Sequence, residues 1–337
     1  MNYYGACFEP YVGPFVGSQP VLYNAYTKDQ VVAMLTAVNN DGFKHLLTYG
    51  QGVFVWQGKP LVQDSNKFII EAAAGLGQRV SAGCYQQGAN PGGDSFNVAW
   101  TKAEIDYAID QAKKYKNVEE LLITNESIWG PGSLANITSL LAYAKGLRGS
   151  LPISVTTHQR WDVLAGVDNH TPSYAPIRQG LLTMLAACET CIYANVYPYF
   201  DSNLWAQLGT NPTEAHFKSV VTASLEGTWQ ALLTAFQNNG ITLECRIGEI
   251  GWPTQGSQAA QPHPELATPT YAKWHYDAVA TWLAKNGVKA YLFEAIDEPW
   301  KGNQAGNNSE AYFGKMVADG SATNPGSYTL RSVKAKY

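Results

Sequence analysis

The chain has 337 residues, of which 45% are hydrophobic and 15% are charged, and its formal net charge is −4. This length suits one large α/β barrel or two ordinary domains. A slightly acidic chain without a basic patch excludes nucleic acid and anionic membranes as expected partners. No apolar stretch approaches the roughly 20 residues that a membrane-spanning helix needs.

Apolar runs with the character of strands alternate with segments of helical spacing along most of the chain. Eight such repeats, of which the last lacks an obvious long helix, predict a single (β/α)8 barrel that spans residues 1–337 as one domain. The main alternative is a doubly wound sheet, but no glycine-rich fingerprint follows the first strand. In chain order, the predicted elements are the strand Tyr3–Phe8, the helix Lys28–Asn39, the strand His45–Tyr49, the helix Asn66–Leu76, the strand Arg79–Tyr85, the helix Lys102–Tyr115, the strand Leu121–Thr124, the helix Leu134–Leu147, the strand Ile153–Thr157, the helix Ile177–Ala187, the strand Cys191–Val196, the helix Glu214–Asn238, the strand Leu243–Gly248, the helix Ala272–Lys285 and the strand Val288–Phe293.

The chain contains five cysteines, an odd number, so at least one of them has no intramolecular partner. Cys188 and Cys191 form an isolated CxxC, which without further context indicates packing or one local disulfide rather than a redox or zinc site. We recognise no cluster of metal ligands and no phosphate-binding loop, so we expect neither a metal nor another cofactor.

Two glutamates, more than a hundred residues apart, stand at the ends of apolar predicted strands. Glu126 follows the run Leu121–Asn125, and Glu249 follows Arg246–Gly248. Catalytic residues of a (β/α)8 barrel lie at the carboxyl ends of the strands, and strands four and seven lie nearly opposite each other around the ring. One strand-end glutamate is more often a surface or capping residue. A pair on one rim supplies what hydrolysis of a glycosidic bond requires.

With their neighbours, these glutamates resemble the catalytic residues of glycoside hydrolase family 17, which carries its acid/base after strand four and its nucleophile on strand seven. The sequence departs from the family at Thr124, where glycine is usual, and at Gly248, where serine is frequent. The motifs cover most of the chain and are Tyr49 within Leu47–Gly50, Asn125-Glu126, Asn195–Phe200, Glu249–Pro253 and Phe293–Lys301.

The resemblance implies a retaining mechanism, in which Glu249 attacks the anomeric carbon as a carboxylate and Glu126 gives its proton to the leaving oxygen. Such a mechanism places the two carboxyl groups about 5–5.5 Å apart. Asn125 is expected to donate to the sugar 2-hydroxyl, although a strand-end asparagine also ties down turns, and Tyr197 to orient the nucleophile. The further residues expected to bind substrate are Tyr49, Trp129, Asn195, Tyr199, Trp252, Glu298, Trp300 and Lys301.

The implied activity is cleavage of β-glucan, most directly a β-1,3-linked one, and a β-1,2 or β-1,6 preference stays open. A transglycosylase would use the same glutamates with a sugar as acceptor, and Trp129 and Trp161 would form its acceptor subsites. A non-catalytic carbohydrate-binding barrel predicts binding without turnover, which the presence of both glutamates disfavours. The fold alone also permits unrelated chemistry, but we find no strand-end lysine or clustered histidines for it.

The expected partner is a β-glucan oligosaccharide or polysaccharide, and the protein is expected to be a monomer. Met1–Cys7 is typical of a first strand and not of a signal peptide. We nevertheless expect the protein to be secreted or extracytoplasmic.

Overall fold

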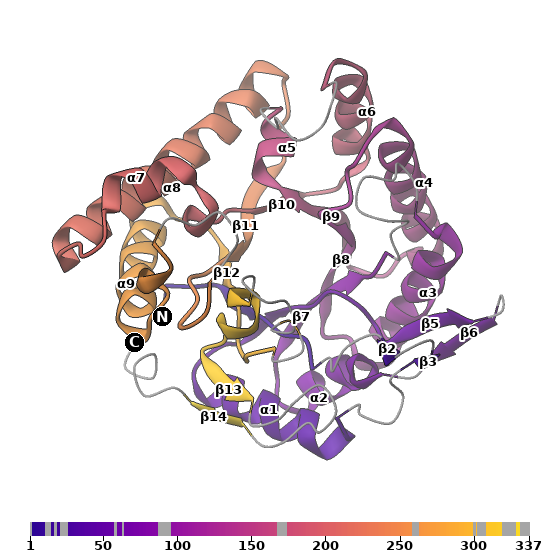
Figure 1. Ribbon diagram of the computed structural model, residues 1–337. Coiled ribbons are helices and arrows are strands. Elements are labelled where there is room, and N and C mark those ends of the chain that lie inside the picture. The colour runs from indigo at the N-terminus through magenta and orange to yellow at the C-terminus, as the bar shows by residue number, and fades with distance from the viewer. Residues whose placement is uncertain are drawn as a thin grey trace.

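A computed structural model describes residues 2–10, 15–16, 19–20, 26–56, 59–62, 64–86, 96–166, 174–257, 263–298, 301, 308–318 and 328–330. Within these residues, eight parallel strands form a closed barrel in the order β1-β12-β11-β10-β9-β8-β7-β4, and helices surround it (Figure 1). The predicted (β/α)8 barrel is therefore confirmed. The barrel strands are β1 Gly5–Cys7, β4 His45–Leu47, β7 Arg79–Cys84, β8 Val118–Asn125, β9 Ser154–Arg160, β10 Cys191–Asn195, β11 Glu244–Ile250 and β12 Ala290–Leu292.

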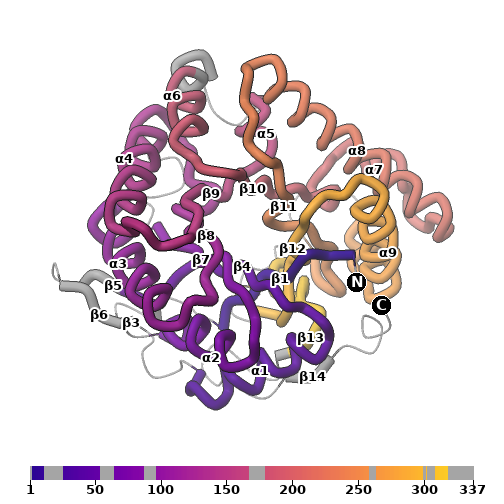
Figure 2. The backbone as a smooth tube through the Cα atoms, turned by 180° about the vertical axis from the view of Figure 1, so that it is seen from behind, coloured from indigo at the N-terminus to yellow at the C-terminus, as the bar shows by residue number. Residues whose placement is uncertain are grey.

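The helices around the barrel follow the predicted segments, with shifted ends and two short additions, α5 and α7. Figure 2 shows the ring of helices from the opposite side, where α8 runs beside α9 and α1 lies beside α2. Among the described residues, no helix combines the length and the apolarity that crossing a membrane would require. The helices are α1 Lys28–Asn40, α2 Ile69–Gly75, α3 Val98–Tyr115, α4 Pro131–Arg148, α5 Trp161–Ala165, α6 Tyr174–Ala187, α7 Ser202–Leu208, α8 Glu214–Asn238 and α9 Pro269–Asn286.

The ends of the helices are set by capping residues that the sequence carries. α1 begins after Thr27, whose side chain accepts from the backbone N–H of Gln30 while the Gln30 side chain accepts from the backbone of Thr27. α9 begins at Pro269 and ends before Gly287, which adopts a φ of 65°. α3 begins four residues earlier than predicted, at Val98, because the side chain of Asn97 caps it.

Among the described residues, three two-stranded antiparallel sheets accompany the barrel: β2 Phe15–Val16 with β3 Gln19–Pro20, β5 Val53–Trp56 with β6 Lys59–Val62, and β13 Met316–Ala318 with β14 Tyr328–Leu330. All five cysteines lie in the described residues and are unpaired. The local disulfide between Cys188 and Cys191, one of the two interpretations of that CxxC, is therefore wrong, and both thiols are buried in packed surroundings.

A cluster of polar side chains fills the barrel near the amino ends of its strands. Arg246 on β11 donates from Nη1 to Glu120 Oε1 at 2.8 Å and to the Tyr193 hydroxyl at 2.9 Å. Ser81 on β7 donates to the other oxygen of Glu120 at 2.5 Å and lies 3.0 Å from the Tyr291 hydroxyl. The barrel is thus plugged at this end, and the opposite end, where the strands finish, is open.

Candidate active site

A cavity of about 1310 Å³ lies at the carboxyl ends of the barrel strands. This volume exceeds the roughly 300–1,000 Å³ of an ordinary small-molecule pocket, so the cavity has room for several units of a chain-like ligand. Its centre is lined by residues from the ends of β4, β8, β9, β10, β11 and β12, namely Tyr49, Asn125, Glu126, Arg160, Asn195, Glu249 and Phe293.

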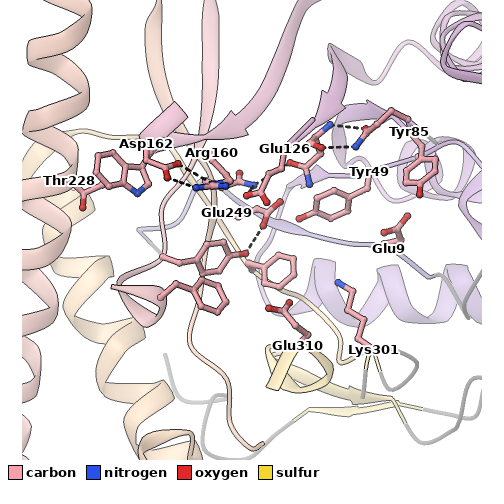
Figure 3. Close-up of a pocket in the computed structure, with 18 of the residues that line it drawn as sticks. Glu9, Tyr49, Tyr85, Glu126, Arg160, Asp162, Thr228, Glu249, Lys301 and Glu310 are labelled. Atoms are coloured by element: carbon pink, nitrogen blue, oxygen red, sulfur yellow. Dashed lines mark hydrogen bonds and ion pairs between the residues drawn. The ribbon is translucent and has the colours of Figure 1, made fainter. Parts of the chain in front are cut away.

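The cavity continues past this centre in two directions. On one side it reaches Asp162 and Thr228, and on the other it reaches Tyr85 and Glu9. Figure 3 shows the carboxyl groups of Glu126 and Glu249 directed toward one another between these two arms. The structure therefore brings together the two glutamates that the sequence singled out, in the middle of an extended cleft.

Glu126 stands just beyond the end of β8, where the regular strand geometry has been lost. The register between β8 and β9 shifts between Leu122 and Asn125, and Glu126 has a φ of 46°. Its backbone N–H donates to the carbonyl of His158 at 3.0 Å. Its carboxylate oxygen Oε1 accepts from Asn195 Nδ2 at 2.7 Å, and the same nitrogen lies 3.2 Å from Asn125 Oδ1. The predicted residues Asn125 and Asn195 thus lie beside the predicted acid.

Glu249 lies within β11 and is 6% exposed. The hydroxyl of Tyr197 donates to its Oε2 at 2.5 Å. On its other side, His158 Nε2 lies 3.6 Å from Glu249 Oε1, which is too far for a hydrogen bond. Burial lowers the pKa of His158 to about 3, so the imidazole beside the carboxylate is neutral.

Gly248 makes room for that histidine. A Cβ at Gly248 would lie 2.1 Å from His158 Nε2 and 2.5 Å from its Cδ2. A serine at this position, which the resemblance would favour, therefore cannot coexist with His158 in its present place. The position of the buried His158 therefore requires glycine at position 248, where the family often has serine.

Burial raises the pKa of both catalytic candidates, but their other neighbours differ. For Glu249, burial and the charge of Glu126 raise the pKa to about 8, while Tyr197, Lys301 and Tyr49 act in the opposite direction. For Glu126, burial raises the pKa, and the amide of Asn195 and the charge of Arg160 oppose it. Each of the two carboxyl groups thus has a hydrogen-bond donor and a positive charge that favour its ionised form, and burial that opposes it.

Lys301 is a positively charged residue that lines the cleft near Glu249. It forms an ion pair with Glu298 and lies 5.1 Å from the centre of the Phe293 ring. The negative charges of Glu298 and Glu294 raise the pKa of Lys301 despite its burial. Lys301 lines the cleft, whereas Glu298 is 3% exposed and lies behind it. Glu298 is therefore placed to hold the lysine rather than to touch a ligand.

Three predicted aromatic contacts do not line the cleft. Tyr199 and Trp252 are both buried, with ring centres 4.9 Å apart, and Trp252 Nε1 donates to the carbonyl of Leu266 at 2.9 Å. Trp252 also packs against Phe217 of α8, at 5.0 Å between ring centres. These rings fill the space between barrel and helices, which corrects the expectation that they contact substrate.

Trp129 is half-buried against the core and is absent from the cleft lining, and Trp300 lies outside the described residues.

Sequence reasoning missed several cleft residues that were nevertheless accessible to it. Glu9 directly follows the first predicted strand and occupies the same strand-end position as the two chosen glutamates. Arg160 and Asp162 were missed because the fifth strand was ended at Thr157, whereas β9 runs to Arg160. Gln86 is the second residue after β7 and lines the cleft beside Asn125.

Residues 5–314 match the family model of the BtgE/BtgC glycoside hydrolase domain. A glucan 1,3-β-glucosidase of Candida albicans is 26% identical over 192 residues, which are 55% of this chain and 53% of that protein. The acidic isoform GL161 of glucan endo-1,3-β-glucosidase from Nicotiana tabacum is 29% identical over 209 residues, or 56% of this chain and 59% of that protein. The matches thus span only about half the length of these curated relatives.

The fold is shared with solved structures, among them the following two. An endo-laminarinase from Formosa superposes with a TM-score of 0.68 at 18% identity, over 95% of this chain and 84% of that chain. A glycoside hydrolase family 17 β-1,3-glucanosyltransferase from Rhizomucor miehei superposes with a TM-score of 0.62 at 15% identity, over 96% and 95% of the two chains. At these identities the likeness concerns the fold.

Proposed function

We propose that this chain, which belongs to the BtgE/BtgC glycoside hydrolase domain family, is a retaining glycosidase that cleaves β-1,3-linked glucan. The observation that carries the proposal is the pair Glu126 and Glu249, which share one cleft but have different hydrogen-bond donors. A retaining glycosidase needs one carboxylate as a nucleophile and one carboxylic acid as a proton donor, and two carboxyl groups directed toward one another in one cleft can take these two roles.

In the first step, the Glu249 carboxylate attacks the anomeric carbon while Glu126 transfers its proton to the glycosidic oxygen. The carbon–oxygen bond to the leaving sugar breaks, and the donor sugar becomes an ester of Glu249. Glu249 then carries no charge, so Glu126, now a carboxylate, takes a proton from an incoming water. The oxygen of that water attacks the anomeric carbon and releases Glu249.

The neighbours of the two glutamates have supporting roles in this proposal. Tyr197 holds the nucleophile through its 2.5 Å hydrogen bond. Asn195 bridges Glu126 and Asn125, which leaves the Asn125 amide nitrogen to donate to the sugar 2-hydroxyl. Tyr49 and Lys301 line the donor side of the nucleophile and favour its ionised form.

The β-1,3 linkage is proposed on the printed names of the relatives, which are glucan 1,3-β-glucosidases and a glucan endo-1,3-β-glucosidase. The motifs at both glutamates support a wider kinship with glycoside hydrolase family 17. The two arms of the cleft support binding of several sugar units on either side of the scissile bond. We also propose a single domain, a monomer and a location outside the cytoplasm, where β-glucan polymers are met.

A second candidate is transfer of the donor sugar to another sugar. The arm of the cleft that contains Arg160, Trp161 and Asp162 favours it, because an aromatic ring and a charged pair provide contacts for an acceptor sugar. Trp129, the other aromatic residue expected there, does not line this arm.

The test is incubation of the wild-type protein, Glu126→Gln and Glu249→Gln with β-1,3-, β-1,2- and β-1,6-linked glucans. We expect turnover of the β-1,3 glucan by the wild type and a loss of about 10³-fold or more in Glu249→Gln. Products longer than the starting oligosaccharide would identify the transferase alternative. Unchanged hydrolysis by Glu249→Gln, or turnover of only another linkage, would contradict the proposal.

A further inference from the structure

The turn that carries Glu126 has an unusual backbone. Thr124 has a φ of 65° and Glu126 has a φ of 46°, so residues on both sides of Asn125 lie in the left-handed region. Side chains with a Cβ rarely adopt this conformation, and a β-branched residue such as threonine does so least readily. Such a conformation persists only where the surrounding structure holds it, and side-chain hydrogen bonds hold this turn.

Two glutamine side chains bind the turn from opposite sides. Gln86 donates from Nε2 to the carbonyl of Asn125 at 2.7 Å and accepts from the Asn125 N–H at 3.0 Å. Gln159 donates from Nε2 to Thr124 Oγ1 at 3.1 Å and accepts on Oε1 from the N–H of Ser127 at 3.0 Å. Gln86 therefore bonds both backbone groups of Asn125, as a neighbouring strand would, whereas Gln159 joins a side chain and a backbone N–H at the two ends of the turn.

The Gln159 side of the turn is a closed, buried network. Thr124 Oγ1 also accepts from Ser127 Oγ at 2.6 Å. Gln159 Nε2 uses its second hydrogen on Thr157 Oγ1 at 2.8 Å, and the Thr157 hydroxyl donates to the carbonyl of Ile123 at 2.6 Å. Thr124, Ser127, Thr157 and Gln159 are all at most 2% exposed. A buried polar network with its partners satisfied fixes one geometry.

We propose that Gln159 is a positioning residue for the acid/base, and that Gln86 assists it from the cleft side. Neither the amide of Gln159 nor the hydroxyls bonded to it line the cleft, so Gln159 does not contact substrate. It holds the turn between Thr124 and Ser127 and thereby fixes the direction in which Glu126 points. This inference rests on the proposed function, in which Glu126 is the proton donor.

The role makes a specific kinetic prediction, because proton donation matters only when the leaving group needs a proton. In Gln159→Leu, which keeps the volume and removes the hydrogen bonds, kcat on a laminari-oligosaccharide should fall by about 10- to 100-fold, with KM within about twofold. With a dinitrophenyl β-glycoside, whose leaving group departs as the anion, kcat/KM should stay within about threefold. A loss that depends on the leaving group is not produced by general damage to the fold.

Gln78→Leu is the matched control. Gln78 is also fully buried and donates to a backbone carbonyl, that of Phe43, at 3.0 Å, but it precedes β7 at the other end of the barrel. We expect Gln78→Leu to lower the melting temperature without any dependence on the leaving group. Should Gln159→Leu not fold, Ser127→Ala removes one bond to Thr124 and should give a smaller loss with the same leaving-group dependence.

Equal losses on both substrates in Gln159→Leu, or no loss on either, would overturn the positioning role while leaving the proposed function intact. The same holds for Ser127→Ala if it is the variant measured. Absence of turnover of both substrates by the wild-type protein would overturn the proposed function and this inference with it.

Discussion

At the scale of single residues, the division of labour between the two glutamates depends on the donors that face each of them. Tyr197 donates to Glu249 at 2.5 Å, and Tyr49 and Lys301 further favour its charged form. Glu126 has one amide donor, from Asn195. A donor to a carboxylate stabilises the charged state and lowers the pKa, so the Tyr197 hydroxyl favours the ionised form that the proposed nucleophile needs.

Tyr197→Phe removes one of these donors and should therefore raise the pKa of Glu249. Because the nucleophile must be ionised, the acidic limb of the kcat/KM profile should move to higher pH by about one unit. The basic limb, which reports the proton on Glu126, should move less. The measurement is a pH–rate profile beside Tyr271→Phe, whose ring lies at the start of α9. An acidic limb that stays in place would contradict this role of Tyr197.

At the scale of elements, β8 shows why a local apolar pattern can miss part of a strand. The predicted strand covered only Leu121–Thr124, because Glu119 and Glu120 interrupt the apolar pattern. In the structure β8 begins at Val118, since both glutamates find partners on other strands of the barrel. Glu120 binds Arg246 of β11 inside the barrel, and Glu119 binds Arg79 of β7 near the surface. Pairing between distant strands is a tertiary property that no local pattern contains.

The Glu120–Arg246 pair makes a prediction about stability. The side chains of Arg246 and Glu120 are 8% and 9% exposed, so Arg246→Met leaves an uncompensated buried carboxylate and should lower the free energy of unfolding by about 3–5 kcal/mol. The matched variant is Arg79→Met, whose side chain is 46% exposed in its ion pair with Glu119 and should cost less than about 1 kcal/mol. Urea unfolding measures both values. Similar losses in the two variants would show that burial of the pair is unimportant.

At the scale of the whole molecule, the sequence predicted the barrel and the central pair because both follow from periodicity and from strand ends. It was harder to predict which aromatic residues line the cleft. Tyr199 and Trp252 were assigned to substrate because flat rings suit sugars, yet the same rings suit core packing. Their place is decided by Phe217 of α8 and Leu266 before α9, residues far apart in the chain. The hydrogen bonds that hold the Glu126 turn likewise come from Gln86, just after β7, and from Gln159 on β9.

Labelling of the nucleophile tests the central claim most directly, namely that Glu249 captures the donor sugar covalently and Glu126 delivers the proton. A 2-deoxy-2-fluoro β-glucosyl or laminaribiosyl fluoride slows the second step, so the ester accumulates and its mass can be read on a proteolytic peptide. We expect one added glycosyl group per chain, on the peptide that contains Glu249, and none in Glu249→Gln. A label on another residue, or turnover without any labelled intermediate and with inversion at the anomeric carbon, would contradict the account.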